Sequence, residues 1–84
     1  MTVAELTTKL NGVDPDRIVI LQKDSEGNGY SPLSDIDDNA MYEADTTYSG
    51  SVGLQRLTPE LKKQGYTDED EGGGVPCLVL YPIN

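Results

Sequence analysis

The chain contains no histidine, tryptophan or phenylalanine, and its only cysteine is Cys77. Without imidazole, the Ser-His-Asp and Cys-His catalytic arrangements cannot be built in their usual form. One thiol without histidine does not make a zinc site, and it cannot form a disulfide within the chain. Neither GxxxxGK[ST] nor GxGxxG, the common phosphate-binding loops, occurs. We therefore expect a protein that binds rather than catalyses, with no cofactor and no metal.

Positive charge is also scarce. Six Lys and Arg residues stand against fifteen Asp and Glu, giving a formal net charge of −9. This balance opposes binding to DNA, RNA and anionic membranes, which attract basic surfaces. No apolar run approaches the roughly 20 residues that span a bilayer, and the first ten residues, which include Glu5, do not resemble a signal peptide. We expect an intracellular protein without direct nucleic-acid or membrane binding.

The chain is short, with 84 residues of which 36% are apolar, so we expect a single domain over residues 1–84. A chain of this size buries only roughly 60–65% of the surface that its unfolded form exposes. Chains with so small a core often gain stability by self-association, because a subunit interface extends the core. We therefore expect a homo-oligomer.

Local patterns predict an α+β fold. Thr2 and Glu5 form a capping box that begins a helix over residues 3–11. Residues 17–23 read as a strand covered on both faces, or covered by the helix on one face and by a second subunit on the other, because four apolar β-formers follow one another. Asn28-Gly29 favours a hairpin turn with positive φ at both residues.

The second half of the chain contains further predicted elements. They are a strand over 30–36 that Pro32 confines to an edge or bulge, a strand over 40–44, a loop or irregular edge over 46–53, a short helix over 58–65, an acidic-glycine loop over 68–74 that is disordered in isolation, and a last strand over 75–82 that holds a buried Cys77. The expected sum is an N-terminal helix packed on a small, mainly antiparallel sheet of three to four strands, with a short second helix before the last strand.

Tyrosine and arginine supply the candidate binding residues. Tyrosine suits rims and stacking surfaces, and arginine can grip a phosphate with two parallel hydrogen bonds. The predicted ligand-binding residues are Tyr48, Arg56, Ser49, Ser51, Tyr30 and Arg17. Tyr48 is the strongest of these, because its polar neighbourhood gives it no reason to be buried. The oxygen-rich loop over 24–35 overlays part of a calcium-binding pattern, but a polar hairpin loop explains it better.

Several short segments at both ends of the chain resemble small accessory proteins of tailed bacteriophages. They are Thr2-Val3-Ala4-Glu5-Leu6, Leu10, Asp14-Pro15-Asp16, Ile18-Val19-Ile20, Gly29-Tyr30-Ser31-Pro32-Leu33 and Val79-Leu80-Tyr81-Pro82. The resemblance implies a protein of the host-cell cytoplasm and carries over no site residues. Phage proteins of this size often oppose host defence, and some are oligomers that sequester nucleotide signals.

Three functions are consistent with these observations. The first is a homo-oligomer that sequesters a small anionic, nucleotide-type ligand. The second is an acidic inhibitor or DNA mimic that acts on a basic host protein. The third is a component of the virion or of its assembly.

Overall fold

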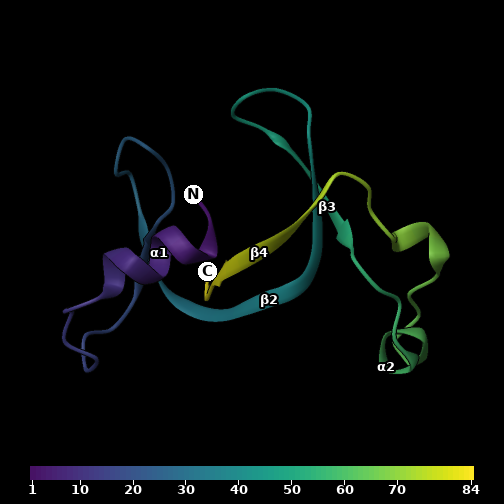
Figure 1. Ribbon diagram of the computed structural model, residues 1–84, viewed down its shortest axis with the longest axis horizontal. Helices are drawn as coiled ribbons and strands as arrows, with labels where there is room; N and C mark the ends of the chain where they lie inside the picture. The colour runs from purple at the N-terminus through teal and green to yellow at the C-terminus, as the bar shows by residue number, and fades with distance from the viewer. The chain divides into compact units, whose positions relative to one another are not determined.

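The structure is a computed structural model that describes residues 1–84. The elements follow the order α1 (Val3–Leu10), β1 (Ile20–Gln22), β2 (Tyr30–Ala44), β3 (Gly50–Leu54), α2 (Pro59–Lys63), the 3₁₀ turn η1 (Asp68–Asp70) and β4 (Val75–Pro82) (Figure 1). The chain divides into two units. Unit 1 comprises Met1–Asp35 with Leu80–Asn84, and unit 2 comprises Ile36–Val79.

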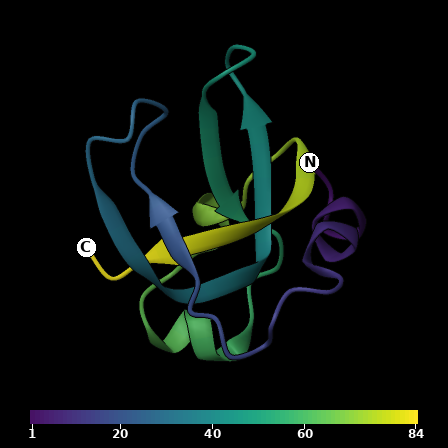
Figure 2. The same cartoon turned by 90° about the vertical axis from the view of Figure 1, so that its left-hand side faces the viewer.

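The sheet is organised around β2, with which each of the other three strands pairs. Antiparallel β1 lies opposite the start of β2, with Ile20 facing Pro32 and Gln22 facing Tyr30. Antiparallel β3 lies opposite its end, where Ala40 faces Leu54. Figure 2 shows β2 and β3 as a hairpin, with β4 running beside β2. The predicted α+β class, with an N-terminal helix and a short second helix before the last strand, is confirmed.

The helix termini follow the sequence signals. In α1 the Thr2 hydroxyl accepts a hydrogen bond from the Glu5 N–H, and the Glu5 carboxylate accepts one from the Thr2 N–H, so the predicted capping box is complete. The helix ends one residue earlier than predicted, just before Gly12, whose φ is +86°. In α2 the Thr58 hydroxyl accepts from the Leu61 N–H, as a predicted N-cap should.

The predicted strand over 17–23 is mostly wrong. Only Ile20–Gln22 forms the strand β1. A turn that joins the Arg17 N–H to the Asp14 carbonyl occupies the start of the segment, and just before β1 the Val19 carbonyl accepts from the Leu33 N–H of β2 at 2.9 Å. Coverage on both faces is also wrong within this chain, since Ile18 is 81% exposed and Val19 is 53% exposed. A run of apolar β-formers therefore lies unburied in unit 1.

The predicted strands over 30–36 and 40–44 are one continuous strand, β2. Pro32 lies inside this central strand, so the prediction that it confines the strand to an edge or a bulge is wrong. The missing Pro32 N–H costs the ladder one hydrogen bond near the strand's start, while its carbonyl still accepts from the Ile83 N–H at 3.1 Å.

The predicted hairpin forms, because consecutive β1 and β2 pair antiparallel, but its turn differs from the prediction. Asn28 does not adopt positive φ, and Gly27 does instead, at +79°. The Asp24 side chain accepts hydrogen bonds from two backbone N–H groups of this loop, so a longer loop replaces the tight Asn-Gly turn.

Residues 46–53 contain a strand that the sequence did not predict. Gly50–Leu54 forms β3 although it contains two glycines, which have low strand propensity. The glycines are required by close contacts rather than by propensity. A Cβ atom on Gly53 would lie 2.6 Å from the Gly72 Cα.

The predicted acidic-glycine loop over 68–74 begins with the ordered turn η1. The last strand, β4, has the predicted bounds and lies at an edge of the sheet. Cys77 in this strand is free and half-buried rather than fully buried.

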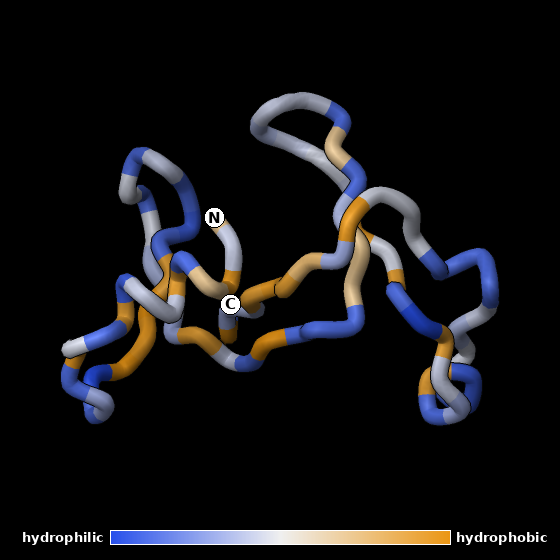
Figure 3. Tube along the Cα trace, in the orientation of Figure 1, coloured by the Kyte–Doolittle hydropathy of each residue, from blue (hydrophilic) through white to orange (hydrophobic).

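Neither unit encloses a core of its own. Ala40 in unit 2, 1% exposed, is the only buried apolar residue, and Ser31 in unit 1, 0% exposed, is the only buried polar one. Large apolar side chains are exposed in both units, and in unit 1 even α1 contributes Val3 and Leu10 to this surface. Figure 3 shows the apolar segments along the trace. Each unit has about 40 residues, which is near the size at which a chain needs another source of stability.

Ser31 fixes the end of the chain within unit 1. Its hydroxyl oxygen accepts hydrogen bonds from the Ile83 N–H at 3.0 Å and the Asn84 N–H at 3.2 Å. The same hydroxyl donates to the Pro32 carbonyl at 3.0 Å. One small buried side chain therefore satisfies two terminal backbone donors.

We predict that Ser31→Ala destabilises the protein by about 1 kcal/mol, because the Asn84 N–H loses its acceptor and the Ile83 N–H keeps only the Pro32 carbonyl. Chemical denaturation measures the loss, and amide hydrogen exchange should accelerate at both terminal amides, most at Asn84. Ser34→Ala, at an exposed position of the same strand, is the control and should leave stability nearly unchanged. Unaltered exchange at the two terminal amides in Ser31→Ala would contradict the role assigned to the hydroxyl.

Candidate functional site

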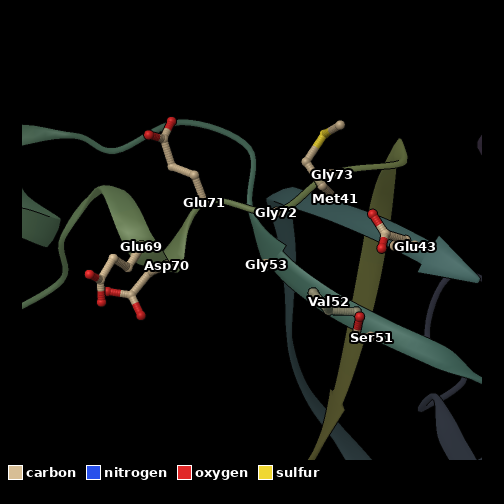
Figure 4. Close-up of a pocket in the computed structure, with 10 residues that line it drawn as sticks. All are labelled: Met41, Glu43, Ser51, Val52, Gly53, Glu69, Asp70, Glu71, Gly72 and Gly73. Atoms are coloured by element: carbon tan, nitrogen blue, oxygen red, sulfur yellow. The ribbon is translucent and has the colours of Figure 1, made fainter.

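Unit 2 contains a hollow of about 330 Å³ between the β2–β3 hairpin and the segment formed by η1 and the residues that follow it. Its lining residues come from these two parts of the chain and are drawn in Figure 4. They are Met41, Glu43, Ser51, Val52, Gly53, Glu69, Asp70, Glu71, Gly72 and Gly73.

The hollow is formed by direct backbone contact. The Gly72 N–H donates to the Leu54 carbonyl at 2.9 Å, and Leu54 forms a parallel bridge with Glu71. At this junction Gly53 and Gly72 approach so closely that a Cβ on either would lie within 3.0 Å of the other's backbone. Glycine is needed at both positions, because only a residue without a side chain permits this approach.

A capping box holds two of the acidic residues in place. The Thr67 hydroxyl accepts from the Glu69 N–H at 3.3 Å, and the Asp70 carboxylate accepts from the Thr67 N–H at 2.8 Å. The η1 turn therefore has a defined conformation although its sequence is Asp-Glu-Asp.

The electrostatic character of the hollow is negative. Glu43, Glu69, Asp70 and Glu71 line it, and no Lys or Arg does. Figure 4 shows the Glu43 carboxylate on the β2 side and the other three on the segment around η1. Like charges arranged in this way attract a cationic group and repel phosphate or carboxylate. The hollow therefore does not suit the anionic ligand that the sequence suggested.

One of the six predicted ligand-binding residues lines this hollow. Ser51 lies on β3 opposite Glu43. Tyr48 and Ser49 lie in the loop of the β2–β3 hairpin, where Tyr48 is 88% exposed. The Ser49 hydroxyl is 2.7 Å from the Thr46 hydroxyl, which also accepts from the Tyr48 N–H at 3.2 Å.

Arg56 lies beyond the other end of β3. Its backbone is held by Asn39, whose side chain accepts from the Arg56 N–H and donates to the Arg56 carbonyl, each at 2.9 Å. Because β3 separates Tyr48 from Arg56 by about 14 Å of strand, one chain does not bring the two side chains together. Tyr30, which is 62% exposed, and Arg17, which follows an exposed turn, belong to unit 1.

The acidic lining was only partly detectable in the sequence. The run over 68–74 stood out by composition, but nothing in it indicated that it would adjoin β3. Glu43 lies in an ordinary strand pattern, and only the register of β2 against β3 places it opposite Ser51. The contact between Gly53 and Gly72 has no sequence signal, because the residues around a glycine do not identify the distant residue that it contacts.

The loop that overlays a calcium-binding pattern uses its first carboxylate for another purpose. Asp24 Oδ1 accepts from the Asn28 N–H at 3.1 Å and the Glu26 N–H at 2.9 Å. The backbone hydrogen bond from Asn28 is the largest cause that lowers the pKa of Asp24 below its usual value, and those from Glu26 and Gly27 add to it. Nowhere in the chain do three or more Asp, Glu, His or Cys residues form a group that could hold a metal ion.

Comparison with known proteins identifies no relative: no family model, no curated protein and no solved structure matches the chain. Neither α1 nor α2 has the length and apolar character that crossing a membrane requires.

We predict that Gly53→Ala destabilises the protein by about 1–3 kcal/mol, because the new methyl group meets the Gly72 backbone. Urea denaturation measures this loss. Gly73→Ala is the matched control, because its Cβ would meet only the flexible Glu43 side chain. Equal stability of the two variants would contradict the backbone contact between β3 and the segment after η1.

Proposed function

We propose that the protein is a non-catalytic binding protein that works as a homo-oligomer. The supporting observation is the exposure of its apolar side chains, since each unit buries only one residue fully. Such small units gain stability when a second copy covers apolar surface. The absence of imidazole and the single half-buried thiol also favour capture of a ligand over catalysis.

We predict that the protein has a molar mass above the 9.1 kDa of one chain. Light scattering coupled to size-exclusion chromatography measures it. The midpoint of thermal unfolding should rise with protein concentration, because association stabilises the folded state by mass action. A single-chain mass at every concentration, with a constant midpoint, would overturn the proposal.

The captured ligand that the hollow favours is a basic segment of a partner protein. Four carboxylates without a neighbouring cation match Lys and Arg side chains. This agrees with the net charge of −9, and it corresponds to the second of the functions considered from the sequence. The resemblance to phage accessory proteins suggests that the partner is a host defence protein.

A nucleotide-type ligand is a second candidate, and the exposed Tyr48 favours it. A free aromatic ring beside the hydroxyl groups of Thr46 and Ser49 can stack on a base. In an oligomer, Tyr48 of one copy and Arg56 of another could form one site although a single chain keeps them apart.

The two ligands are distinguished by isothermal titration with a lysine- and arginine-rich peptide and by thermal shift with a panel of nucleotides. We expect the peptide to bind and Glu69→Gln/Asp70→Asn/Glu71→Gln to weaken it. The matched control, Asp14→Asn/Asp16→Asn/Glu26→Gln, removes the same charge from unit 1 and should bind as the native protein does.

Equal weakening in both triple variants would show that net charge, not the hollow, attracts the peptide. A nucleotide at a hundred times its dissociation constant should instead add about 2.7 kcal/mol of stability, and Tyr48→Ala should abolish that gain. Stabilisation by a nucleotide without peptide binding would favour the second candidate over the first.

A further inference from the structure

The strand β4 is an edge of the sheet that carries no charged side chain, so its only protection against pairing with another chain is its two prolines. Its only strand partner is β2, and residues 72–84 contain no Lys, Arg, Asp or Glu side chain. Edge strands are normally kept from pairing with other chains by charged side chains, bulges or proline. In Figure 3 the trace of this strand carries apolar colours. The open edge therefore has the chemistry of a strand-pairing surface.

The prolines of β4 limit where such pairing can occur. The Ile83 N–H points toward β2, since it donates to the Pro32 carbonyl. Because N–H groups alternate in direction along a strand, the even-numbered positions face the open edge. Pro76 and Pro82 occupy two of these positions and have no N–H to offer. The two leucines between them, at positions 78 and 80, therefore supply the outward donors of this strand.

The pattern of these residues is symmetric about Val79. Pro76 and Pro82 each lie three positions from it, and Leu78 and Leu80 each lie one. A two-fold interface is self-complementary, so a residue before the axis meets the residue equally far after it. The segment Pro-Cys-Leu-Val-Leu-Tyr-Pro has the arrangement that such an axis requires.

We propose that a second copy of the chain pairs antiparallel with the open edge of β4, with the two-fold axis at Val79. Leu78 then faces Leu80 of the second copy and exchanges both backbone hydrogen bonds with it, and the symmetric pair does the same. Val79 faces its own counterpart as a pair without hydrogen bonds between the two residues. Pro76 faces Pro82 of the second copy and ends the ladder at each side.

Other symmetric registers leave some of the outward backbone N–H and carbonyl groups of the two leucines without a hydrogen-bond partner. An axis at any other residue of 77–81 places an outward leucine carbonyl opposite a proline, which has no N–H to donate. With the axis at Leu78, for instance, the Leu80 carbonyl lies opposite Pro76. Only the axis at Val79 pairs both the N–H and the carbonyl of both leucines.

The pairing also explains the exposure along this strand. Leu80 and Tyr81 are 39% and 42% exposed in the single chain, and an adjoining strand places a side chain beside each. The net charge of −9 arises outside residues 72–84, so no charged side chains face each other across the new ladder. This inference rests on the proposed self-association and specifies its surface.

The test is a cysteine placed on the axis in the full chain. In Cys77→Ser/Val79→Cys, the Cα atoms of the two introduced cysteines should lie about 4.5 Å apart. This distance is within the range for a disulfide. We expect mild oxidation to convert this variant to a covalent dimer on a non-reducing gel. The native protein is the matched control, because Cys77 of the two copies would be offset by about 13 Å and should not cross-link.

A second variant, Val79→Lys, should lower the molar mass to that of one chain by placing like charges face to face. Val13→Lys, at an exposed position outside the helices and strands, is its control and should keep the native mass. If Cys77→Ser/Val79→Cys forms an oligomer that oxidation does not cross-link, pairing through β4 is overturned and self-association is left standing. A monomeric native protein would overturn both.

Discussion

The backbone pairing of β2 is the constraint on which the rest of this structure depends. This strand of 15 residues is the common partner of β1, β3 and β4. In most domains a hydrophobic core holds the elements together, and hydrogen bonds specify the arrangement. Here only Ala40 and Ser31 are fully buried, so the ladders along β2 carry an unusual share of the organisation. Changes in β2 therefore affect every strand of the sheet.

The few side chains that reinforce this framework act on backbone groups. Ser31 satisfies the N–H groups of Ile83 and Asn84, and Asn39 holds both backbone groups of Arg56. Each contact fixes a segment where it leaves the sheet. Because hydrogen bonds of this kind contribute only about 0.5–1.5 kcal/mol each, they position segments more than they stabilise the whole. A fully buried apolar side chain contributes more, about 1.5–3 kcal/mol, and few apolar side chains are buried here.

The sequence predicted those elements whose signals are local. The Thr2–Glu5 capping box, the Thr58 cap and the apolar run of β4 each depend on neighbouring residues, and all three elements formed as expected. The elements that were wrong depend on distant partners. β1 is shorter than the predicted strand over 17–23 because only three residues of that segment are in register with β2. β3 forms from a glycine-containing segment because β2 provides the hydrogen-bonding partner.

The candidate site likewise combines features with a local sequence signal and features that depend on distant residues. The acidic run over 68–74 and the exposure of Tyr48 followed from composition and context. The placement of Glu43 and Ser51 beside that run depended on strand register and on the Gly53–Gly72 contact. Such a contact joins residues 19 positions apart, and no single-sequence pattern encodes it. The sequence therefore indicated which residues carry charge or an exposed aromatic ring, but not that the acidic residues line a hollow beside β3.

The Gly53–Gly72 junction separates the shape of the hollow from its charge. Its geometry is set by two residues without side chains. Its charge is set by four carboxylates, of which those of Glu43, Glu69 and Glu71 lie on exposed residues and take no part in the Thr67–Asp70 capping contact. Substitutions at these three exposed positions can reduce or reverse the charge of the hollow without disturbing the backbone that forms it. Descendants of this chain can therefore change that charge at little cost to folding, provided that both glycines are retained.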